Sequence, residues 1–145
     1  MLAEFIGAVI KRNDKYLIEI QDLNENMYAA FPRAEAINAV ACKEEILKYC
    51  LKDKYGMDIC INKSIYEEDF RDNDCVISFG YYDADLLNDV ISEGFIWVGE
   101  DELDKLTFAF GDNIAVMIIT GKEKSREDIM EENRRYFDDR KEAKK

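Results

Sequence analysis

Several side chains in residues 39–55 could bind a metal ion or a phosphate group. Glu44, Glu45 and Asp53 supply carboxylates, and Lys52 and Lys54 flank Asp53 with positive charge. Carboxylates three or four residues apart share one face of a helix and can coordinate magnesium together. Glu44 and Glu45 precede Asp53 by two to three helical turns, so they could join it only through an unusual helix or loop. We expect all three to be solvated helical acids.

Other kinds of site lack the residues that they need. The chain has no histidine, which removes the usual Ser/His/Asp and Cys/His nucleophilic arrangements. Its four cysteines, Cys42, Cys50, Cys60 and Cys75, show neither CxxC nor Cys/His spacing, so no zinc motif is present. We expect them to be reduced, partly buried thiols in a cytoplasmic protein.

The net charge of −12 argues against several kinds of partner. A field of this sign repels nucleic-acid backbones and anionic membrane surfaces, so we expect neither as a partner. The charge is uneven, because residues 122–145 hold 9 basic and 8 acidic residues and residues 1–121 hold 11 and 24. An anionic ligand of residues 1–121 would therefore need a local basic group or a metal ion. The apolar stretch of residues 5–10 is too short to span a bilayer.

One domain of 145 residues, 48% of them hydrophobic, must position these side chains around a single core. The patterns predict strands over residues 3–11, 16–20, 57–65, 75–82 and 94–98, with the first two as a hairpin and the next two paired. They predict helices over residues 39–55, between Asn38 as cap and Gly56 as stop, and over residues 113–119, capped by Asp112. This order predicts an α+β or α/β sandwich with a mixed sheet between helices.

Residues 122–145 predict an amphipathic helical extension beyond a main domain of residues 1–121. Ser125 and Asp128 resemble a capping box that opens a helix ending near Ala143. Four apolar side chains, Ile129, Met130, Tyr136 and Phe137, fall close to one face of it. We expect this face to dock on the domain or on a second copy of it, which would make a homodimer.

Three short segments, in this order, resemble the Nudix hydrolase superfamily. Residues 28–32 (Tyr-Ala-Ala-Phe-Pro) are similar to the entry of the family's signature loop, and residues 55–57 (Tyr-Gly-Met) are similar to its exit. Residues 97–108 resemble the family's Trp, Glu-Leu and Phe segment near the C-terminus. The resemblance covers about residues 3–120. It implies a mixed sheet between helices, to which the C-terminal helix is an addition, and magnesium-dependent hydrolysis of nucleoside diphosphate derivatives.

The family's magnesium site depends on Arg-Glu and Glu-Glu pairs on one helix, and this sequence does not repeat them. With Gly56 as anchor the pairs fall on Tyr49-Cys50 and Asp53-Lys54, and with Pro32 as anchor they fall on Lys48-Tyr49 and Lys52-Asp53. Asp53 is the one carboxylate present in either register. A single aspartate between lysines is a poor magnesium site.

Three basic or aromatic side chains are candidates for binding a ligand in the cleft that the resemblance implies. Arg33, directly after Pro32, would bind phosphate in place of the metal, although we favour an exposed arginine that covers apolar surface. Lys54 would replace part of the metal's charge. Trp97 would stack on a base, although an aromatic residue in a short strand is more often part of the core.

These observations support a leading hypothesis and two alternatives. The leading hypothesis is a catalytically weak or inactive Nudix-like module that binds a small-molecule phosphate or nucleotide without a metal cofactor. The first alternative is an active hydrolase whose magnesium is held by Glu44, Glu45 and Asp53, or by acids elsewhere, namely Glu67, Glu68, Glu100 or Asp101. The second alternative is a structural or oligomeric role with an empty cleft.

Overall fold

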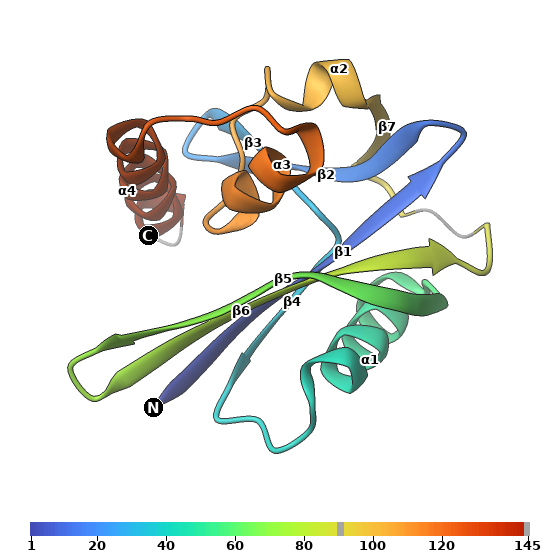
Figure 1. Ribbon diagram of the computed structural model, residues 1–145, viewed down its shortest axis with the longest axis horizontal. Coiled ribbons are helices and arrows are strands. Elements are labelled where there is room, and N and C mark those ends of the chain that lie inside the picture. Colours follow the sequence, from blue (N-terminus) through green and yellow to red (C-terminus); the bar gives the residue numbers. More distant parts are fainter. Residues whose placement is uncertain (90–91, 144–145) are drawn as a thin grey trace.

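The strands form one seven-stranded mixed sheet around β1 (Figure 1). The computed structural model describes residues 1–89 and 92–143, without the side chain of Asp72. The strands are β1 (Leu2–Arg12), β2 (Lys15–Leu23), β3 (Asn26–Ala30), β4 (Arg33–Ile37), β5 (Ile59–Asp72), β6 (Cys75–Leu86) and β7 (Phe95–Gly99). Their path runs β3-β2-β1-β6-β5, while β4 pairs with β1 and β7 pairs with β2. The parallel β1–β6 pair among antiparallel neighbours confirms the predicted mixed sheet.

Helices cover both faces of this sheet (Figure 1). They are α1 (Lys43–Tyr55), α2 (Glu100–Leu103), α3 (Asp112–Thr120) and α4 (Arg126–Ala143). Alternate residues of β1 point to opposite faces, so Ile6 joins the core cluster of Leu47 in α1, while Val9 joins that of Val116 in α3. None of the helices in the described part of the chain is long and apolar enough to cross a membrane.

Helix α1 ends where the sequence predicts and begins four residues later than it predicts. Gly56 adopts a left-handed conformation with φ 69°, and its N–H donates to the Lys52 carbonyl at 2.9 Å, which closes the helix. Asn38, the predicted cap, instead accepts a hydrogen bond on Oδ1 from the Leu2 N–H at 2.8 Å. Cys42 is the residue that caps α1, and it makes no side-chain cap bond. Asn38 therefore ties the end of β4 to β1.

Helix α3 also begins differently from the prediction. Its cap residue is Gly111, with φ 86°, and Asp112 lies in the first turn with its side chain buried. A Cβ atom at Gly111 would lie 2.5 Å from the Phe79 ring and 2.8 Å from the Tyr81 hydroxyl oxygen. Glycine is required here on both counts, and the close approach brings Asp112 against Tyr81.

Two strands lie in segments that the pattern of residues does not predict. The polar segment of residues 22–27 belongs to a hairpin, in which Asn24 and Glu25, at φ 53° and 65°, form the turn that joins β2 to β3. Strand β4 pairs antiparallel with β1 from Gly7↔Arg33 to Ala3↔Ile37. Its sequence, Arg-Ala-Glu-Ala-Ile, is poor in the β-branched and aromatic residues that favour strands, so pairing with β1 decides that β4 is a strand.

Helix α4 docks on the β2–β3 hairpin through a mixed apolar and polar contact. Tyr136 is 3% exposed and meets the Tyr28 ring edge-on at 5.3 Å between centroids. Asp139 accepts hydrogen bonds from the Tyr28 hydroxyl at 2.5 Å, Asn26 Nδ2 at 3.0 Å and Asn24 Nδ2 at 3.3 Å. Met130 is 61% exposed, so it does not belong to the docking face.

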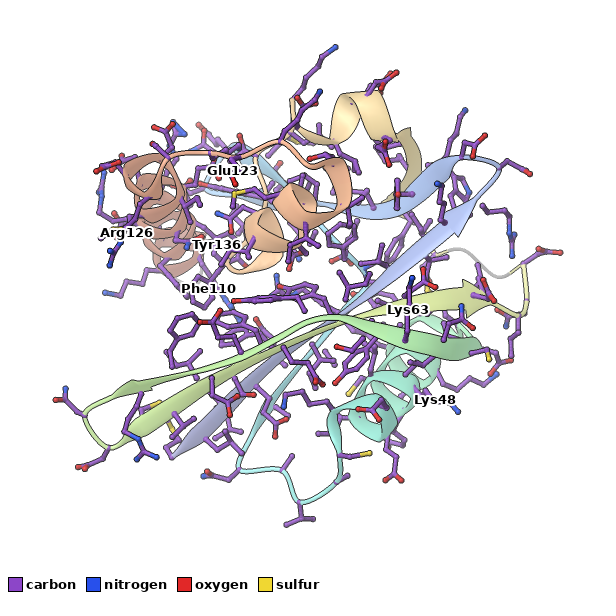
Figure 2. The ribbon with its side chains drawn as sticks, viewed as in Figure 1. Lys48, Lys63, Phe110, Glu123, Arg126 and Tyr136 are labelled. Atoms are coloured by element: carbon purple, nitrogen blue, oxygen red, sulfur yellow. The ribbon has the colours of Figure 1, made fainter. Side chains whose placement is uncertain are left out.

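The other expected apolar residues of α4 make smaller contributions. Phe137 packs on Phe110 at 4.7 Å between ring centroids, and Ile129 is half-buried. Figure 2 shows Phe110 close to Tyr136. Ser125 Oγ accepts the Asp128 N–H at 3.2 Å, as the predicted capping box requires. The docking face is thus centred on the last two turns of the helix.

The docking contact predicts that two alanine substitutions on α4 differ strongly in their effect on the free energy of unfolding. Tyr136→Ala removes a buried ring and should lower the free energy of unfolding by about 3 kcal/mol. Met130→Ala removes an exposed side chain and should change it by less than about 0.5 kcal/mol. Urea unfolding followed by circular dichroism measures both, and equal effects of the two substitutions would contradict the docked arrangement.

Candidate functional site

A cleft of about 620 Å³ opens where β2, β4, α1 and α4 meet. Most of its lining side chains are charged or polar. The lining consists of Gln21, Asp22, Leu23, Arg33, Ala34, Glu35, Cys50, Asp53, Lys54, Tyr136 and Arg140. Strand β4 and the last turns of α1 are adjacent because Ala34 packs in the same core cluster as Leu47 and Leu51. The C-terminal helix adds Tyr136 and Arg140, so the extension forms part of the cleft.

The structure brings three of the sequence candidates into this cleft and leaves three outside it. Arg33, Asp53 and Lys54 line it together. Glu44 and Glu45 lie in the exposed first turn of α1 and are not among the described lining residues.

Trp97 also lies outside the cleft lining. This β7 residue packs against the core cluster of Leu17, and the guanidinium carbon of Arg12 lies 5.6 Å from its ring centroid. Trp97 is therefore not placed to stack on a base bound in this cleft.

The acids of the active-hydrolase alternative are dispersed. Glu67 accepts a short hydrogen bond from the Tyr82 hydroxyl, and Glu68 accepts one from the Tyr66 hydroxyl at 2.5 Å. Glu100, at the start of α2, accepts from the Tyr16 hydroxyl at 3.3 Å. Within residues 1–89 and 92–143, no group of three His, Cys, Asp or Glu side chains is placed to hold a metal ion.

Arg33 is buried, contrary to the expectation of an exposed arginine. It is 6% exposed, and its guanidinium carbon lies 5.8 Å from the Phe5 ring centroid. Its Nη1 lies 3.7 Å from Asp112 Oδ1, and its Nη2 donates to Glu35 Oε1 at 3.5 Å. Nε and Nη1 are buried and have no hydrogen-bond partner in the described part of the chain. Because these two nitrogens are shielded from solvent, the guanidinium brings a poorly solvated positive charge to the cleft.

Asp112 fixes Arg33 in place through a buried network. Asp112 Oδ2 accepts from the Phe31 backbone N–H at 2.9 Å, and Oδ1 accepts from the Tyr81 hydroxyl at 2.5 Å. Burial raises the pKa of Asp112, while Arg33 and Tyr81 favour its ionised form. Burial is the largest influence on Arg33 and by itself would lower its pKa, but Asp112, Tyr81, Tyr136 and Glu35 together outweigh it and the pKa is raised. Arg33 therefore carries its positive charge into the cleft wall.

Glu35 joins the two arginines of the cleft. Its Oε1 accepts from Arg140 Nη1 at 3.0 Å and its Oε2 from Arg140 Nη2 at 2.8 Å, in a paired arrangement across the cleft. Burial by itself would raise the pKa of Glu35. The hydrogen bonds from Arg140 and the charge of Arg33 outweigh burial, so the pKa is lowered. The carboxylate is ionised at neutral pH.

The cleft wall formed by α1 consists of Cys50, Asp53 and Lys54. The Lys54 ammonium lies 4.9 Å from the Tyr55 ring centroid. Burial and the Asp53 charge raise the pKa of the Cys50 thiol. All four cysteines are free, but Cys42 and Cys60 are exposed rather than partly buried.

Sequence reasoning missed Asp112 as a site residue and missed Glu35 and Arg140 altogether. One signal for Asp112 was available, because an acid between Phe110 and the apolar residues 114–119 suggests a buried partner. Nothing in the local pattern distinguishes Arg140 from the other basic residues of residues 122–145.

The chain is similar to solved structures, several of which are described as Nudix hydrolases. It superposes on the E. coli ORF135 protein with a TM-score of 0.70 at 13% identity, over 83% of this chain and 89% of that one. For a MutT NUDIX hydrolase from Burkholderia pseudomallei the TM-score is 0.64 at 17% identity, over 83% and 99%. For the MutT protein of methicillin-resistant Staphylococcus aureus 252, a Nudix hydrolase, it is 0.62 at 16%, over 85% and 98%.

No protein-family model matches the chain, and no curated protein matches it. At these identities the structural likeness concerns the fold, and it confirms the fold expected from the resemblance in sequence. The activity of the site has to be argued from its own side chains.

The buried network predicts a large cost for removing its acid. Asp112→Ala leaves the Arg33 charge without its buried partner and should lower the free energy of unfolding by about 3–5 kcal/mol. Asp101→Ala removes an exposed acid of α2 and should stay within about 0.5 kcal/mol of the parent. Chemical unfolding measures both, and a small effect of Asp112→Ala would show that Arg33 finds solvent or another partner.

Proposed function

We propose that this protein, which has the fold of the Nudix hydrolases, binds a phosphate-bearing small molecule such as a nucleotide and hydrolyses it weakly or not at all. The cleft beside α1 is the proposed binding site. Three cationic side chains line it, namely Arg33, Lys54 and Arg140. They supply the local positive charge that an anionic ligand of this acidic protein needs.

The observation that carries the proposal is the buried guanidinium of Arg33. It lies 3.7 Å from Asp112, lines the cleft, and keeps a raised pKa despite its burial. Hydrogen bonds between a guanidinium and a phosphate are charge-assisted and suit the planar fork of arginine. A phosphate group in the cleft would meet Arg33 at Nη2, the nitrogen that donates to Glu35.

The proposal of weak hydrolysis rests on the acids at the cleft. The helix positions at which the family's box places glutamates carry Cys50, Asp53 and Lys54 in one register, and Tyr49, Lys52 and Asp53 in the other. A lysine can bind a phosphate oxygen, but it cannot coordinate several phosphoryl oxygens or lower the pKa of a bound water as a metal ion does. Binding is therefore supported better than turnover.

One observation favours the alternative of an active hydrolase. Asp22 of β2 and Asp53 of α1 line the same cleft. Magnesium is often held by one or two carboxylates together with substrate phosphates, so this pair fits a metal that arrives with its ligand. The metal would neutralise phosphate charge and activate water.

Ligand binding should be visible both in affinity and in the reactivity of Cys50. Inorganic pyrophosphate or ADP should bind the parent, and Lys54→Gln should weaken binding by about fivefold through the loss of one ion pair. Lys48→Gln is the matched control, because Lys48 is an exposed lysine of the same helix (Figure 2) and lies outside the cleft lining. Isothermal titration calorimetry measures the three dissociation constants.

Alkylation mapped by mass spectrometry gives the second readout, in which the bound anion should slow modification of Cys50 and leave exposed Cys42 and Cys60 unchanged. Equal protection of all three cysteines, or none at Cys50 under saturating ligand, would place the ligand elsewhere.

Turnover should be slow even with added metal. With magnesium or manganese, phosphate release from nucleoside diphosphate sugars, dinucleoside polyphosphates and nucleoside triphosphates should be at least about a thousandfold below a typical active hydrolase. Robust metal-dependent release that Asp22→Asn or Asp53→Asn abolishes, and that Asp14→Asn in the exposed β1–β2 turn leaves intact, would establish the alternative. A triple Glu44→Gln, Glu45→Gln, Asp53→Asn variant tests the acids of α1 together.

A further inference from the structure

The carboxylate of Glu35 already occupies the place where two arginines of the cleft converge. Arg140 holds both of its oxygens, at 3.0 and 2.8 Å, and Arg33 donates to one of them at 3.5 Å. All three residues line the cleft. Two guanidinium groups therefore share one carboxylate.

We propose that Arg33 and Arg140 form the subsite for a phosphoryl group of the ligand, and that Glu35 is an internal occupant which the phosphoryl group displaces. This inference rests on the proposed function and specifies which side chains receive the anion. The ligand class is a phosphate ester or diphosphate whose phosphoryl group carries more negative charge than a carboxylate.

The local charges favour this exchange. A carboxylate carries one negative charge, whereas a terminal phosphate carries about one and a half to two at neutral pH and has three acceptor oxygens. The three oxygens can satisfy two guanidinium groups at once. The side chain of Glu35 is 34% exposed, so it can swing into solvent, whereas Arg33 is held by Asp112 and stays in the wall.

Other charged groups near Glu35 set the balance of this subsite. Lys54, from α1, also lowers the pKa of Glu35, and Asp112 lies behind Arg33. Tyr136 of α4 lines the cleft beside Arg140. The cleft around the subsite therefore contains the cations Arg33, Lys54 and Arg140, the mobile anion Glu35 and the acids Asp22 and Asp53, while Asp112 belongs to the buried network.

Arg140 comes from the C-terminal helix, so the subsite is complete only when α4 is docked. Docking depends on Tyr136 and on the hydrogen bonds of Asp139 to Tyr28, Asn26 and Asn24. A ligand that binds only the docked state must stabilise it. Arg140 is thus a binding residue contributed by a segment that the resemblance in sequence treats as an addition to the fold.

Two substitutions that break the same ion pair separate this proposal from a purely structural role of the pair. Arg140→Gln removes a phosphate donor and should weaken inorganic pyrophosphate binding by about tenfold. Glu35→Gln removes the competing charge and should tighten it by about fivefold. If the ion pair served only to hold α4 against β4, both variants would weaken binding together or leave it unchanged, because each loses the same contact.

The matched controls are Arg134→Gln and Glu131→Gln. These residues form an exposed ion pair on α4 at 2.6 Å, so each control repeats the charge change of one variant away from the cleft. Calorimetric titration with inorganic pyrophosphate is run on all five proteins, and thermal melts should show similar small losses for Glu35→Gln and Arg140→Gln.

The outcomes distinguish this inference from the proposed function. Opposite shifts for the two variants, with unchanged controls, support the displacement of Glu35. Binding by the parent that both variants leave unchanged, or shift in the same direction, overturns the inference and leaves the proposed function standing. Absence of pyrophosphate binding in both the parent and Glu35→Gln overturns both.

Discussion

The buried contact between Arg33 and Asp112 is the constraint on which the rest of the site depends. Arg33 begins β4 and Asp112 begins α3, and Asp112 also holds the Phe31 backbone and the Tyr81 hydroxyl. A buried charge that loses its partner costs several kcal/mol, so β4, β6 and α3 must keep their relative positions. The same requirement holds one charged guanidinium at the wall of the cleft.

The C-terminal helix completes what this contact begins. It docks on the β2–β3 hairpin with one buried tyrosine and a cluster of hydrogen bonds around Asp139. Helices depend on tertiary contacts more than on their own propensity, so the docked position follows from these partners. Through Tyr136 and Arg140, α4 adds an aromatic ring and a positive charge to the lining of the cleft.

Charge at short range, rather than the charge of the whole chain, decides what the cleft can bind. The chain carries −12, yet Arg33, Lys54 and Arg140 meet in one cleft with Asp22, Glu35 and Asp53. Nearby charges and their partners act more strongly than distant, screened ones. The fold is shared with hydrolases, but a fold does not determine chemistry. The mixed charges of this cleft are the basis on which binding and turnover have to be judged.

The sequence by itself determined the features that depend on neighbouring residues. The hairpin of β1 and β2, the pairing of β5 with β6, the end of α1 at Gly56 and the capping of α4 by Ser125 follow from alternation, turn residues and caps. The resemblance in sequence added the arrangement of these elements, which the structural comparisons bear out.

Only the tertiary structure decided the burial of Arg33, the role of Asp112 and the pairing of Glu35 with Arg140. Phe31 and Asp112 are 81 residues apart in the chain, and Glu35 and Arg140 are 105 apart. Strand β4 likewise exists because β1 offers it a pairing edge. A local pattern reports which residues favour a helix or a strand. It does not report which charges meet, because burial and pairing depend on contacts between distant segments that form only in the folded chain.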